Sequence, residues 1–424
     1  MNKYWVYIVD NYQRDLSSLC WWAINSNFHK KDQVCLVPKF EINPNFISRE
    51  MPDVIVWNYA RPNNIKWIKL AHALGIFNII HDTEGIPRDI TTYFNGIKSG
   101  DLKYIDEIWC WGNKQADFLT NRFKNIKKLV KIRITGSIRY EYAKTLEKVF
   151  YQDNINKVIW NTSFSTLSPK YQSPWREFTQ HHEYLELSRE ETLNKFITFA
   201  SERQTGIEYI KLIASYSQSY QVTLRPHPFE SNNYYMQSFK NLFSNIKFSI
   251  SEDVNLDLSN HSLVIQYGCQ TALDAFIRGV PSIKPNRDDI NIWSKVTPYV
   301  DPIVLREKLT DINFLQEILE IQKKLFQENK INQLLFNLDK SIEIIAYNPK
   351  NNLNKLFRKQ KGFKEKVRIN YLKFKYYIKK KLKINNIENG RKSLTSIDIK
   401  SFLEKNYKEN LWSYENNKCL IKRY

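Results

Sequence analysis

The sequence is poor in cysteine and has no long apolar run. Its 424 residues include only five cysteines, at positions 20, 35, 110, 269 and 419, with no CxxC pair and no Cys/His cluster. This scatter argues against both a disulfide framework and a zinc site, so we expect no bound metal. Because no stretch approaches ~18 consecutive apolar residues, we also expect no transmembrane helix.

The start of the chain does not have the form of a signal peptide. Met1, Asn2 and Lys3 lead into a short apolar run, Tyr4–Val9, which ends in Asp10 and has no small-residue cleavage site. We interpret the run as a first β-strand and expect the protein to stay in the cytoplasm.

Acidic residues are in deficit. There are 44 Asp and Glu against 64 Lys and Arg, and the formal net charge is +20. Such a balance suggests a polyanionic partner, either nucleic acid or an anionic membrane surface. Apolar residues make up 42% and aromatics 14% of the chain, which excludes wholesale disorder. The length is too great for one hydrophobic core, so two domains and an appendage are expected.

The first part of the chain alternates between short apolar runs and helix-length segments. The runs predicted as buried parallel strands are 4–9, 34–37, 54–57, 77–80, 108–111 and 132–135. Between them, Asp15–Ala23 and Ile65–Leu74 are predicted as helices, and Gly75 follows the second one. This order predicts a doubly wound, Rossmann-like α/β domain over residues 1–150.

A second α/β series is predicted over residues 155–345. Its expected strands are 158–160, 222–224, 246–250, 263–266 and 282–284, and its expected helices are 190–215 and the segment from 268 through Arg278. The aromatic, proline-bearing stretch 168–185 is expected to be a long loop over the site. Two such domains in series predict a cleft lined by the carboxyl ends of the strands, where open α/β sheets bind ligands.

Residues 350–424 are predicted to form a basic, helical tail. Segment 355–383 carries thirteen Lys and Arg against one acid, Glu365, with aromatic and aliphatic residues interleaved. This composition is typical of an amphipathic segment. We therefore expect residues 350–383 to bind an anionic membrane surface, which would make the protein peripheral to the inner face of the plasma membrane.

Polar clusters follow several predicted strands. Asp82 and Glu84 come directly after strand 77–80, and either carboxylate can act as a base toward a sugar hydroxyl. Ordinary helix capping is the alternative explanation. Arg225 and His227 follow strand 222–224, and together they can bind a phosphate and stabilise a leaving group. The alternative for His227 is a turn histidine bonded to backbone.

Two further loops are suited to a phosphate. Gly268, Gln270 and Thr271 open a helix whose free N–H groups can bind an anion, and Asp274 one turn later can bind ribose hydroxyls. Ordinary capping with a solvated Asp274 is the alternative. A similar polar loop, residues Asn161, Thr162 and Ser163, follows strand 158–160. After the first strand, Arg14 can bind a substrate carboxylate, or it can simply belong to the surface start of a helix.

These motifs, in this order, resemble the bacterial surface carbohydrate biosynthesis protein family. The likeness covers about residues 1–300. It consists of the D-x-E-G turn at 82–85, Asp106 with Trp111-Gly112 and Gln115, the segment 135–141, the strand end 161–164, the R-P-H-P-x-E signature at 225–230 and the helix start 268–275. The sequence departs from the pattern at Ser137-Ile138, where the family has Asn-Pro, and at Glu141, where it has Asp. The basic tail has no part in the resemblance.

The resemblance implies a GT-B glycosyltransferase that acts in capsule or lipopolysaccharide biosynthesis. The family is similar to the transferases that use CMP-activated Kdo or sialic acid, so the implied donor is a CMP-linked Kdo or nonulosonic acid. The implied acceptor is a glycan or a lipid-linked glycan, and no cofactor is implied. His227 would stabilise the CMP leaving group, while Asp82 or Glu84 would be the base, or the nucleophile if configuration is retained.

Other functions fit parts of the same pattern. A CDP-alcohol transferase or a UDP- or GDP-sugar transferase can use the same scaffold, and an R-P-H-P segment also occurs in CDP-glycerol polymer transferases. The charge alone is also consistent with a nucleic-acid-binding protein. Against that class, the charge is concentrated in the tail and no RRM, KH, zinc-finger or helix-turn-helix pattern is present. We therefore expect no specific nucleic-acid partner.

Overall fold

The computed structural model describes two compact units, and both contain a parallel β-sheet. Unit 1 comprises residues 1–142 and 332–424, and unit 2 comprises residues 143–331. Within them the described residues are 3–10, 12–25, 32–83, 98–149, 155–170, 172–185, 187–216, 220–239, 246–249, 253–289, 291–329, 396–407, 412–415 and 418–421. The expected pair of Rossmann-like α/β domains is confirmed by the strand orders given below.

The sheet of unit 1 has eight strands in the order β12-β13-β2-β1-β3-β4-β5-β6. These are β1 (Tyr4–Val9), β2 (Gln33–Pro38), β3 (Val54–Trp57), β4 (Phe77–His81), β5 (Glu107–Cys110), β6 (Lys131–Ile134), β12 (Trp412–Glu415) and β13 (Lys418–Ile421). The six strands from β1 to β6 are parallel, and all six were predicted from their apolar runs. From β1 the chain builds β2 on one side and then β3 on the other, so the strand order reverses between β1 and β3.

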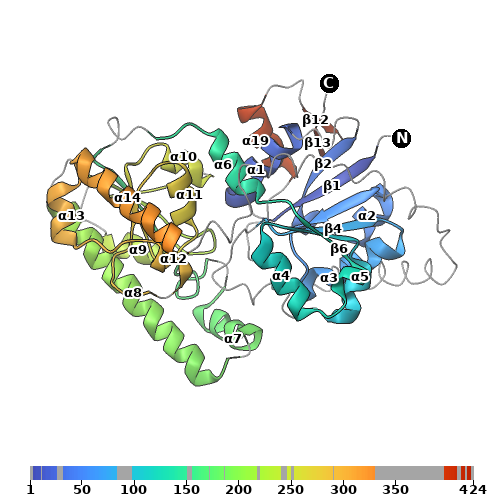
Figure 1. Cartoon of the computed structure of the whole chain (residues 1–424), viewed down its shortest axis with the longest axis horizontal. Coiled ribbons are helices and arrows are strands. Elements are labelled where there is room, and N and C mark those ends of the chain that lie inside the picture. Colours follow the sequence, from blue (N-terminus) through green and yellow to red (C-terminus); the bar gives the residue numbers. More distant parts are fainter. Residues whose placement is uncertain are drawn as a thin grey trace. The chain divides into compact units, whose positions relative to one another are not determined.

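Helices cover both faces of this sheet (Figure 1). They are α1 (Tyr12–Asn25), α2 (Pro44–Glu50), α3 (Pro62–Ala73), α4 (Asn113–Arg122), α5 (Ile126–Leu129), α6 (Ile138–Thr145) and α19 (Ser396–Asn406). Leu16 of α1 and Leu403 of α19 are fully buried against alternate residues of β1, among them Tyr7 and Val9. The period-2 alternation of a strand thus selects which side chains form this core.

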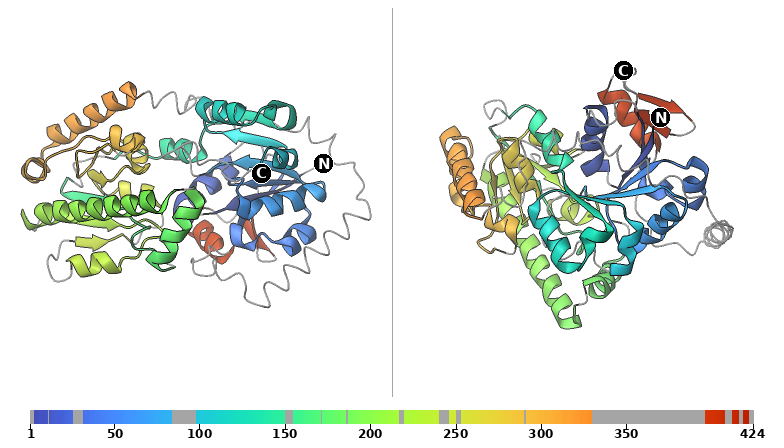
Figure 2. Two further views of the ribbon diagram at one scale, coloured as in Figure 1. Left: turned by 90° about the horizontal axis from the view of Figure 1, so that it is seen from below. Right: turned by 45° about the vertical axis from the view of Figure 1, so that its right-hand side comes forward.

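The last described segment belongs to unit 1. Strand β13 pairs antiparallel with β2, with Cys419 opposite Leu36, and β12 pairs with β13. In Figure 1 and in both views of Figure 2, α19, β12 and β13 lie beside α1 and the first strands. The sequence placed all of 350–424 in one basic tail, whereas β12 and β13 extend the sheet of unit 1 and α19 contributes to its core. Residues 350–383, the expected membrane-binding segment, lie outside the described residues.

The sheet of unit 2 is entirely parallel and has the order β11-β10-β7-β8-β9. Its strands are β7 (Lys157–Asn161), β8 (Gln221–Arg225), β9 (Ile246–Phe248), β10 (Leu263–Gln266) and β11 (Ser282–Ile283). Counted along the chain this is the order 5-4-1-2-3, the strand order of a Rossmann domain. The order reverses between β7 and β10.

Unit 2 contains one long helix and several short ones. They are α7 (Pro174–Leu185), α8 (Arg189–Tyr216), α9 (Asn233–Phe239), α10 (Val254–Leu258), α11 (Thr271–Ile277), α12 (Ile292–Lys295), α13 (Pro302–Lys308) and α14 (Ile312–Glu328). The expectation of a long loop over 168–185 was wrong, because α7 occupies most of it. Pro174 stands at the first position of the helix, where its missing N–H has no cost, and Ser173 accepts from the N–H groups of Arg176 and Glu177.

Successive residues of β7 are buried in different cores. Val158 and Trp160 belong to one hydrophobic cluster, which includes residues of α8 and α14, and Ile159 belongs to another, which includes Val254 and Ala275. Helices therefore cover both sheet faces, as Figure 2 shows. Helix α8 approaches the strand closely because a Cβ at Gly206 would overlap the Trp160 ring. Because helices cover both faces, the loops of unit 2 gather at the ends of the strands, including the carboxyl edge of the sheet.

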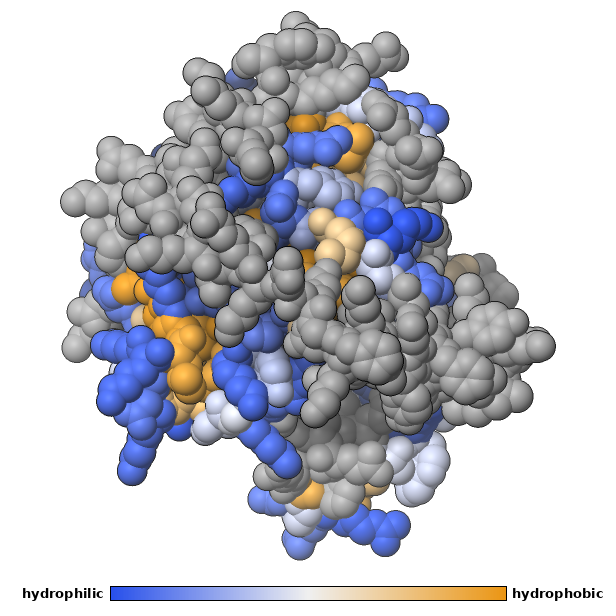
Figure 3. Space-filling view, turned by 90° about the vertical axis from the view of Figure 1, so that its right-hand side faces the viewer, coloured by the Kyte–Doolittle hydropathy of each residue, from blue (hydrophilic) through white to orange (hydrophobic). Residues whose placement is uncertain are grey.

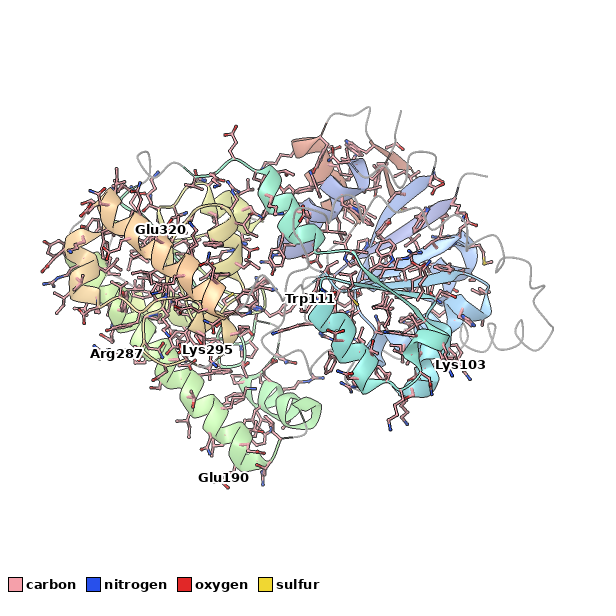
Figure 4. All side chains as sticks on the ribbon, in the orientation of Figure 1. Lys103, Trp111, Glu190, Arg287, Lys295 and Glu320 are labelled. Atoms are coloured by element: carbon pink, nitrogen blue, oxygen red, sulfur yellow. The ribbon has the colours of Figure 1, made fainter. Side chains whose placement is uncertain are left out.

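Among the described helices, none is both long enough and apolar enough to span a bilayer. Where described residues are visible in Figure 3, that face is mainly hydrophilic, with hydrophobic residues in small separate areas. Figure 4 shows Glu190 at the start of α8, and Arg287 and Lys295 after β11.

Candidate functional site

The polar residues predicted for nucleotide binding meet at the carboxyl edge of the unit 2 sheet. Asn161, the last residue of β7, is in register with Gln266 at the end of β10 and with Arg225 at the end of β8. All three strands are parallel, so the loops that follow them begin at the same edge. The interval between β7 and β10, where the strand order reverses, is where doubly wound sheets bind ligands.

Two hydrogen bonds connect the loops on either side of that interval. The Asn161 side-chain amide donates to Thr271 Oγ1 over 2.6 Å, and Ser163 Oγ donates to the backbone carbonyl of Tyr267 over 3.3 Å. Asn161 and Thr271 are 6% and 4% exposed, whereas Ser163 is half-buried. The first two residues therefore shape the loops, and Ser163 is the one of the three at the surface.

Glu230 ties the loop after β7 to the turn after β8. Its carboxylate accepts from Thr162 Oγ1 at 2.6 Å, from the Tyr235 hydroxyl at 2.6 Å, and from the backbone N–H groups of Phe164 and His227 at 3.2 and 3.3 Å. It is 1% exposed, and burial raises its pKa above the usual range against the opposing effect of these donors. The sequence identifies Glu230 only as the last residue of the R-P-H-P-x-E signature, and its spacing of three residues from His227 was the available signal for this role.

His227 is half-buried in the turn that Glu230 holds. The N–H of Phe229 donates to His227 Nδ1 over 3.3 Å, and the two rings are in edge contact at 5.5 Å. A neutral imidazole that accepts at Nδ1 carries its proton on Nε2. Its Nε2–H is then the donor that an anionic oxygen at this edge would meet.

Arg225 has a different environment from the one predicted. Its guanidinium forms an ion pair with Asp257 and contacts Ser249 Oγ at 3.3 Å, and Ser249 in turn donates to Asp257 over 2.7 Å. The residue is 9% exposed. Its charge is therefore balanced inside the protein, which favours a structural role at the end of β8.

The turn after β10 depends on Gly268. Its φ of +56° is in the left-handed region, and a Cβ there would overlap the side chain of Asn291, whose amide donates to the Gly268 carbonyl over 3.1 Å. Gln270, just beyond, is half-buried. Asp274 is 0% exposed, so its predicted contact with ribose is not available in this conformation.

The predicted residues of unit 1 lie at the corresponding edge of its own sheet. Asp82 directly follows β4 and is 5% exposed. Glu84 lies outside the described residues, and Arg14 is in α1 but its side chain is not described. The structure therefore places one of the three, Asp82, at the carboxyl end of a parallel strand.

A charged group that sequence reasoning missed lies beside the strand-order reversal of unit 1. Lys39 Nζ is 3.1 Å from Asp10 Oδ1 and bonded to the Tyr59 hydroxyl. Burial lowers the pKa of Lys39, but Asp10 and Tyr59 outweigh it and the net shift is upward. Arg61 stacks on the Tyr59 ring at 4.6 Å. Asp10 and Lys39 each lie one residue beyond a strand end, and this position was the available signal.

Within the part of the chain that the structure describes, no group of three or more His, Cys, Asp or Glu side chains is arranged to hold a metal ion. The described cysteines are free thiols.

Solved structures with a similar arrangement of elements include UDP-N-acetylglucosamine 2-epimerases and a protein in complex with UDP and glucose. A UDP-N-acetylglucosamine 2-epimerase from Neisseria meningitidis bound to UDP-GlcNAc is 11% identical, with 82% of this chain and 98% of that chain covered and a TM-score of 0.47. The same enzyme from Methanocaldococcus jannaschii is 13% identical, with 81% and 98% covered and a TM-score of 0.45. HepE from Anabaena, in complex with UDP and glucose, is 12% identical, with 81% and 98% covered and a TM-score of 0.42.

No protein-family model matches the sequence, and no curated protein matches it. The resemblance to surface carbohydrate biosynthesis proteins is therefore carried by the quoted motifs alone. The fold stated above rests on the strand orders of this chain.

Proposed function

We propose that this protein is a glycosyltransferase that uses a nucleotide-activated sugar. Unit 2 binds the nucleotide at the carboxyl ends of β7, β8 and β10, and unit 1 binds the acceptor. The observation that carries the proposal is the group of three loops joined by Asn161, Thr271 and Glu230. These buried bonds leave His227, Ser163 and Gln270 at the surface of the edge where Rossmann domains bind nucleotides.

His227 acts on the departing nucleotide. When the bond between the anomeric carbon and the phosphate oxygen breaks, negative charge develops on that oxygen. The tautomer set by the Phe229 N–H places a proton on His227 Nε2, which can donate to the oxygen. Since Glu230 and Pro226 restrict the turn, the imidazole loses little freedom when it makes this bond.

Asp82 and Glu84 serve the reaction from unit 1, in one of two roles. One role is to accept the proton of the acceptor hydroxyl. The other is to stabilise or attack the anomeric carbon, which a retaining reaction requires. Asp82 is buried at the end of β4, where low polarity strengthens its interaction with developing positive charge.

The donor we propose is a CMP-linked Kdo or nonulosonic acid, and the product belongs to a capsule or lipopolysaccharide glycan. This choice follows the likeness of the 82–85 turn and the R-P-H-P-x-E signature to transferases of these sugars. UDP- or GDP-sugars and CDP-alcohols are the alternative donors, and the test includes them all.

The deciding experiment is a panel of nucleotides and donors with the intact protein. We expect CMP or CDP to raise the melting temperature more than UDP or GDP, since a ligand at ~100 times its dissociation constant adds ~2.7 kcal/mol to the free energy of unfolding. Transfer from CMP-sugars to glycan acceptors is then read by mass spectrometry. A larger shift with UDP would replace the CMP assignment, and no shift with any nucleotide, together with binding of an oligonucleotide, would refute the transferase proposal.

A further inference from the structure

Two buried polar atoms at the carboxyl ends of β3 and β4 have no hydrogen-bond partner among the described residues. They are Nδ2 of Asn58 and Nε2 of His81, and each residue is 3% exposed. A buried polar atom without a partner costs free energy that native proteins seldom leave uncompensated. Two such atoms at one sheet edge therefore point to a group that binds there.

The strand register places these residues side by side. The pairing of β3 with β4 ends with Trp57 opposite Ile80. Asn58 and His81 are the next residues on these two parallel strands, and adjacent strands lie ~4.8 Å apart. Val54, Val56 and Ile79 belong to the core cluster beside α1, and side chains alternate along a strand. Asn58 and His81 therefore project toward that same face.

The proton of His81 is already placed. Its ring bonds to the backbone of Gly136, and because Nε2 has no partner, this bond is made by Nδ1–H. Burial is the main cause that lowers the His81 pKa to about 4, while the Gly136 bond acts in the opposite direction. The ring has Trp22 of α1 at 6.2 Å and Trp109 of β5 at 5.6 Å. Nε2 is thus the lone-pair nitrogen of a neutral imidazole.

The chemistry of the pair matches an alcohol. Asn58 Nδ2 carries two N–H donors and His81 Nε2 is one acceptor, so a hydroxyl group can accept one bond from the amide and donate one to the imidazole. A buried water, which typically makes about three hydrogen bonds, can make the same two bonds. An alcohol hydroxyl makes these two bonds and keeps its remaining position for carbon, and the variants described below distinguish it from water.

We propose that Asn58 and His81 bind one hydroxyl group of the acceptor, and that His81 Nε2 takes its proton during transfer. The proposal rests on the glycosyl transfer proposed above. As the acceptor oxygen bonds to the anomeric carbon, the bond from that carbon to the phosphate oxygen breaks and the nucleotide leaves. The acceptor's proton passes to His81 Nε2, and the imidazolium later returns it to water. Asp82 is then left with the second of its two roles, at the anomeric carbon.

The test compares two buried histidines. His81→Gln keeps a polar side chain but removes the base, so we expect transfer to fall ~10²- to 10⁴-fold. His261→Gln is the matched control, because His261 is also buried but both its ring nitrogens are bonded, to Thr223 Oγ1 and the Asp257 carbonyl. That variant should keep its rate. Nucleotide affinity, measured by calorimetry, should be unchanged in both.

Two further readouts separate a base from a structural residue. In His81→Gly, added imidazole should restore part of the lost rate, which it cannot do for a residue that only fills space. Asn58→Ala should raise the acceptor KM by about tenfold, the loss expected for one hydrogen bond. The control is Asn78→Ala on the adjacent strand β4, since Asn78 already bonds Trp57 Nε1 and two carbonyls and should affect stability alone.

Each result has a defined reading. If His81→Gln transfers within about threefold of wild type, or if both variants melt lower while acceptor KM and rate stay constant, the atoms hold only a buried water and the proposal fails. That outcome leaves the transferase proposal intact, because wild-type transfer is measured beside it. If the wild-type protein itself transfers no sugar from any donor, the proposed function is what fails.

Discussion

Asn161 at the end of β7 donates through its side-chain amide to the hydroxyl of Thr271, which lies 2.6 Å away and 110 residues later in the sequence. Both side chains are buried. The bond crosses the interval at which the strand order of unit 2 reverses. It therefore holds the loops after β7 and β10 at a set separation, which is the separation a bound nucleotide would meet.

A double-mutant cycle should detect this coupling. Thr271→Val removes the acceptor and leaves the Asn161 amide buried without it, so we expect the free energy of unfolding to fall by ~1–3 kcal/mol. Asn161→Ala should cost a similar amount, and the double variant should cost less than the sum by at least ~0.5 kcal/mol. Urea denaturation measures all four proteins. Strict additivity would mean that the bond contributes nothing.

His227→Ala should remove most transferase activity while the fold survives. The loss of one donor to a developing oxyanion typically lowers the rate ~10²- to 10³-fold. Circular dichroism and melting temperature serve as the folding controls, since the His227 side chain is half-buried at the edge of unit 2. Turnover within about threefold of wild type would make His227 a turn residue only.

The transfer rate of Asp82→Asn should be measured under the same conditions as that of His227→Ala. If Asp82 acts at the anomeric carbon or as the base, the neutral amide should lower the rate without changing the affinity for nucleotide, for which we propose a site in unit 2. Glu84→Gln is the comparison, because only the residue with the catalytic role should show the full loss. Full activity in both variants would show that neither Asp82 nor Glu84 is the catalytic carboxylate.

Gly268→Ala should be more destabilising than Gly279→Ala. Both glycines have positive φ, +56° and +74°, so each substitution carries the left-handed cost of ~1–2 kcal/mol. Only the Cβ at Gly268 would overlap another side chain, that of Asn291, whereas the nearest atom at Gly279 is at 3.8 Å. The difference between the two melting temperatures therefore measures the overlap, and equal values would show that Asn291 moves aside freely.

The dependence of stability on pH should reveal two opposing groups in unit 1. Burial, helped by the adjacent Glu107, raises the pKa of Asp106 to about 7, against the bond that the Asn78 N–H donates to its carboxylate. A raised acid binds more protons when folded than when unfolded, so its contribution falls as pH rises from about 4 to about 7. The pKa of His81 is lowered to about 4, so its contribution to stability rises as pH rises from about 4 to about 6.5.

Substitution separates the two contributions. Asp106→Asn should make stability rise more steeply with pH between 4 and 6.5, and His81→Gln should make it fall more steeply, each by up to ~1.4 kcal/mol per pH unit. Urea midpoints at half-unit intervals measure the slopes. If a variant has the same slope as the wild type, the replaced group has no shifted pKa in the wild-type protein.

Residues 355–383 should bind anionic vesicles. Each Lys or Arg near an anionic surface contributes ~1 kcal/mol, and this segment has thirteen. The variant to test is an internal deletion of 355–383, because removing everything from 350 onward would also remove Ile399, Leu403 and Ile421 from the core of unit 1. Co-sedimentation should fall with added salt and with the deletion. Binding that ignores both would exclude the segment as the anchor.

The sequence predicted the parallel strands well because most of them are buried on both faces and appear as continuous apolar runs. All six predicted runs of the first series and all five of the second overlap observed strands. Helix α7 was missed because its aromatic and proline-bearing sequence resembles a loop until Pro174 is recognised as a first-turn residue. The strand pair 412–421 was missed because it was grouped by charge with the segment before it.

Site residues were predicted by position better than by role. Strand ends placed Asn161, Ser163 and His227 correctly at one edge, since parallel strands share it. Spacing along the chain does not reveal partners far away in sequence, and so Arg225 was expected to bind a ligand when it pairs with Asp257. Asp274 has the right periodicity for the helix but faces inward, which a single sequence cannot distinguish.

The pairing of β13 with β2 also has a consequence for how the chain is made. Unit 2 is a continuous stretch, so it can fold as soon as residues 143–331 have left the ribosome, while β2 still has an open edge. That edge is closed only when residues 418–421 emerge. An open strand edge is a site of intermolecular pairing, so the β2 edge is exposed to such pairing until residues 418–421 are made.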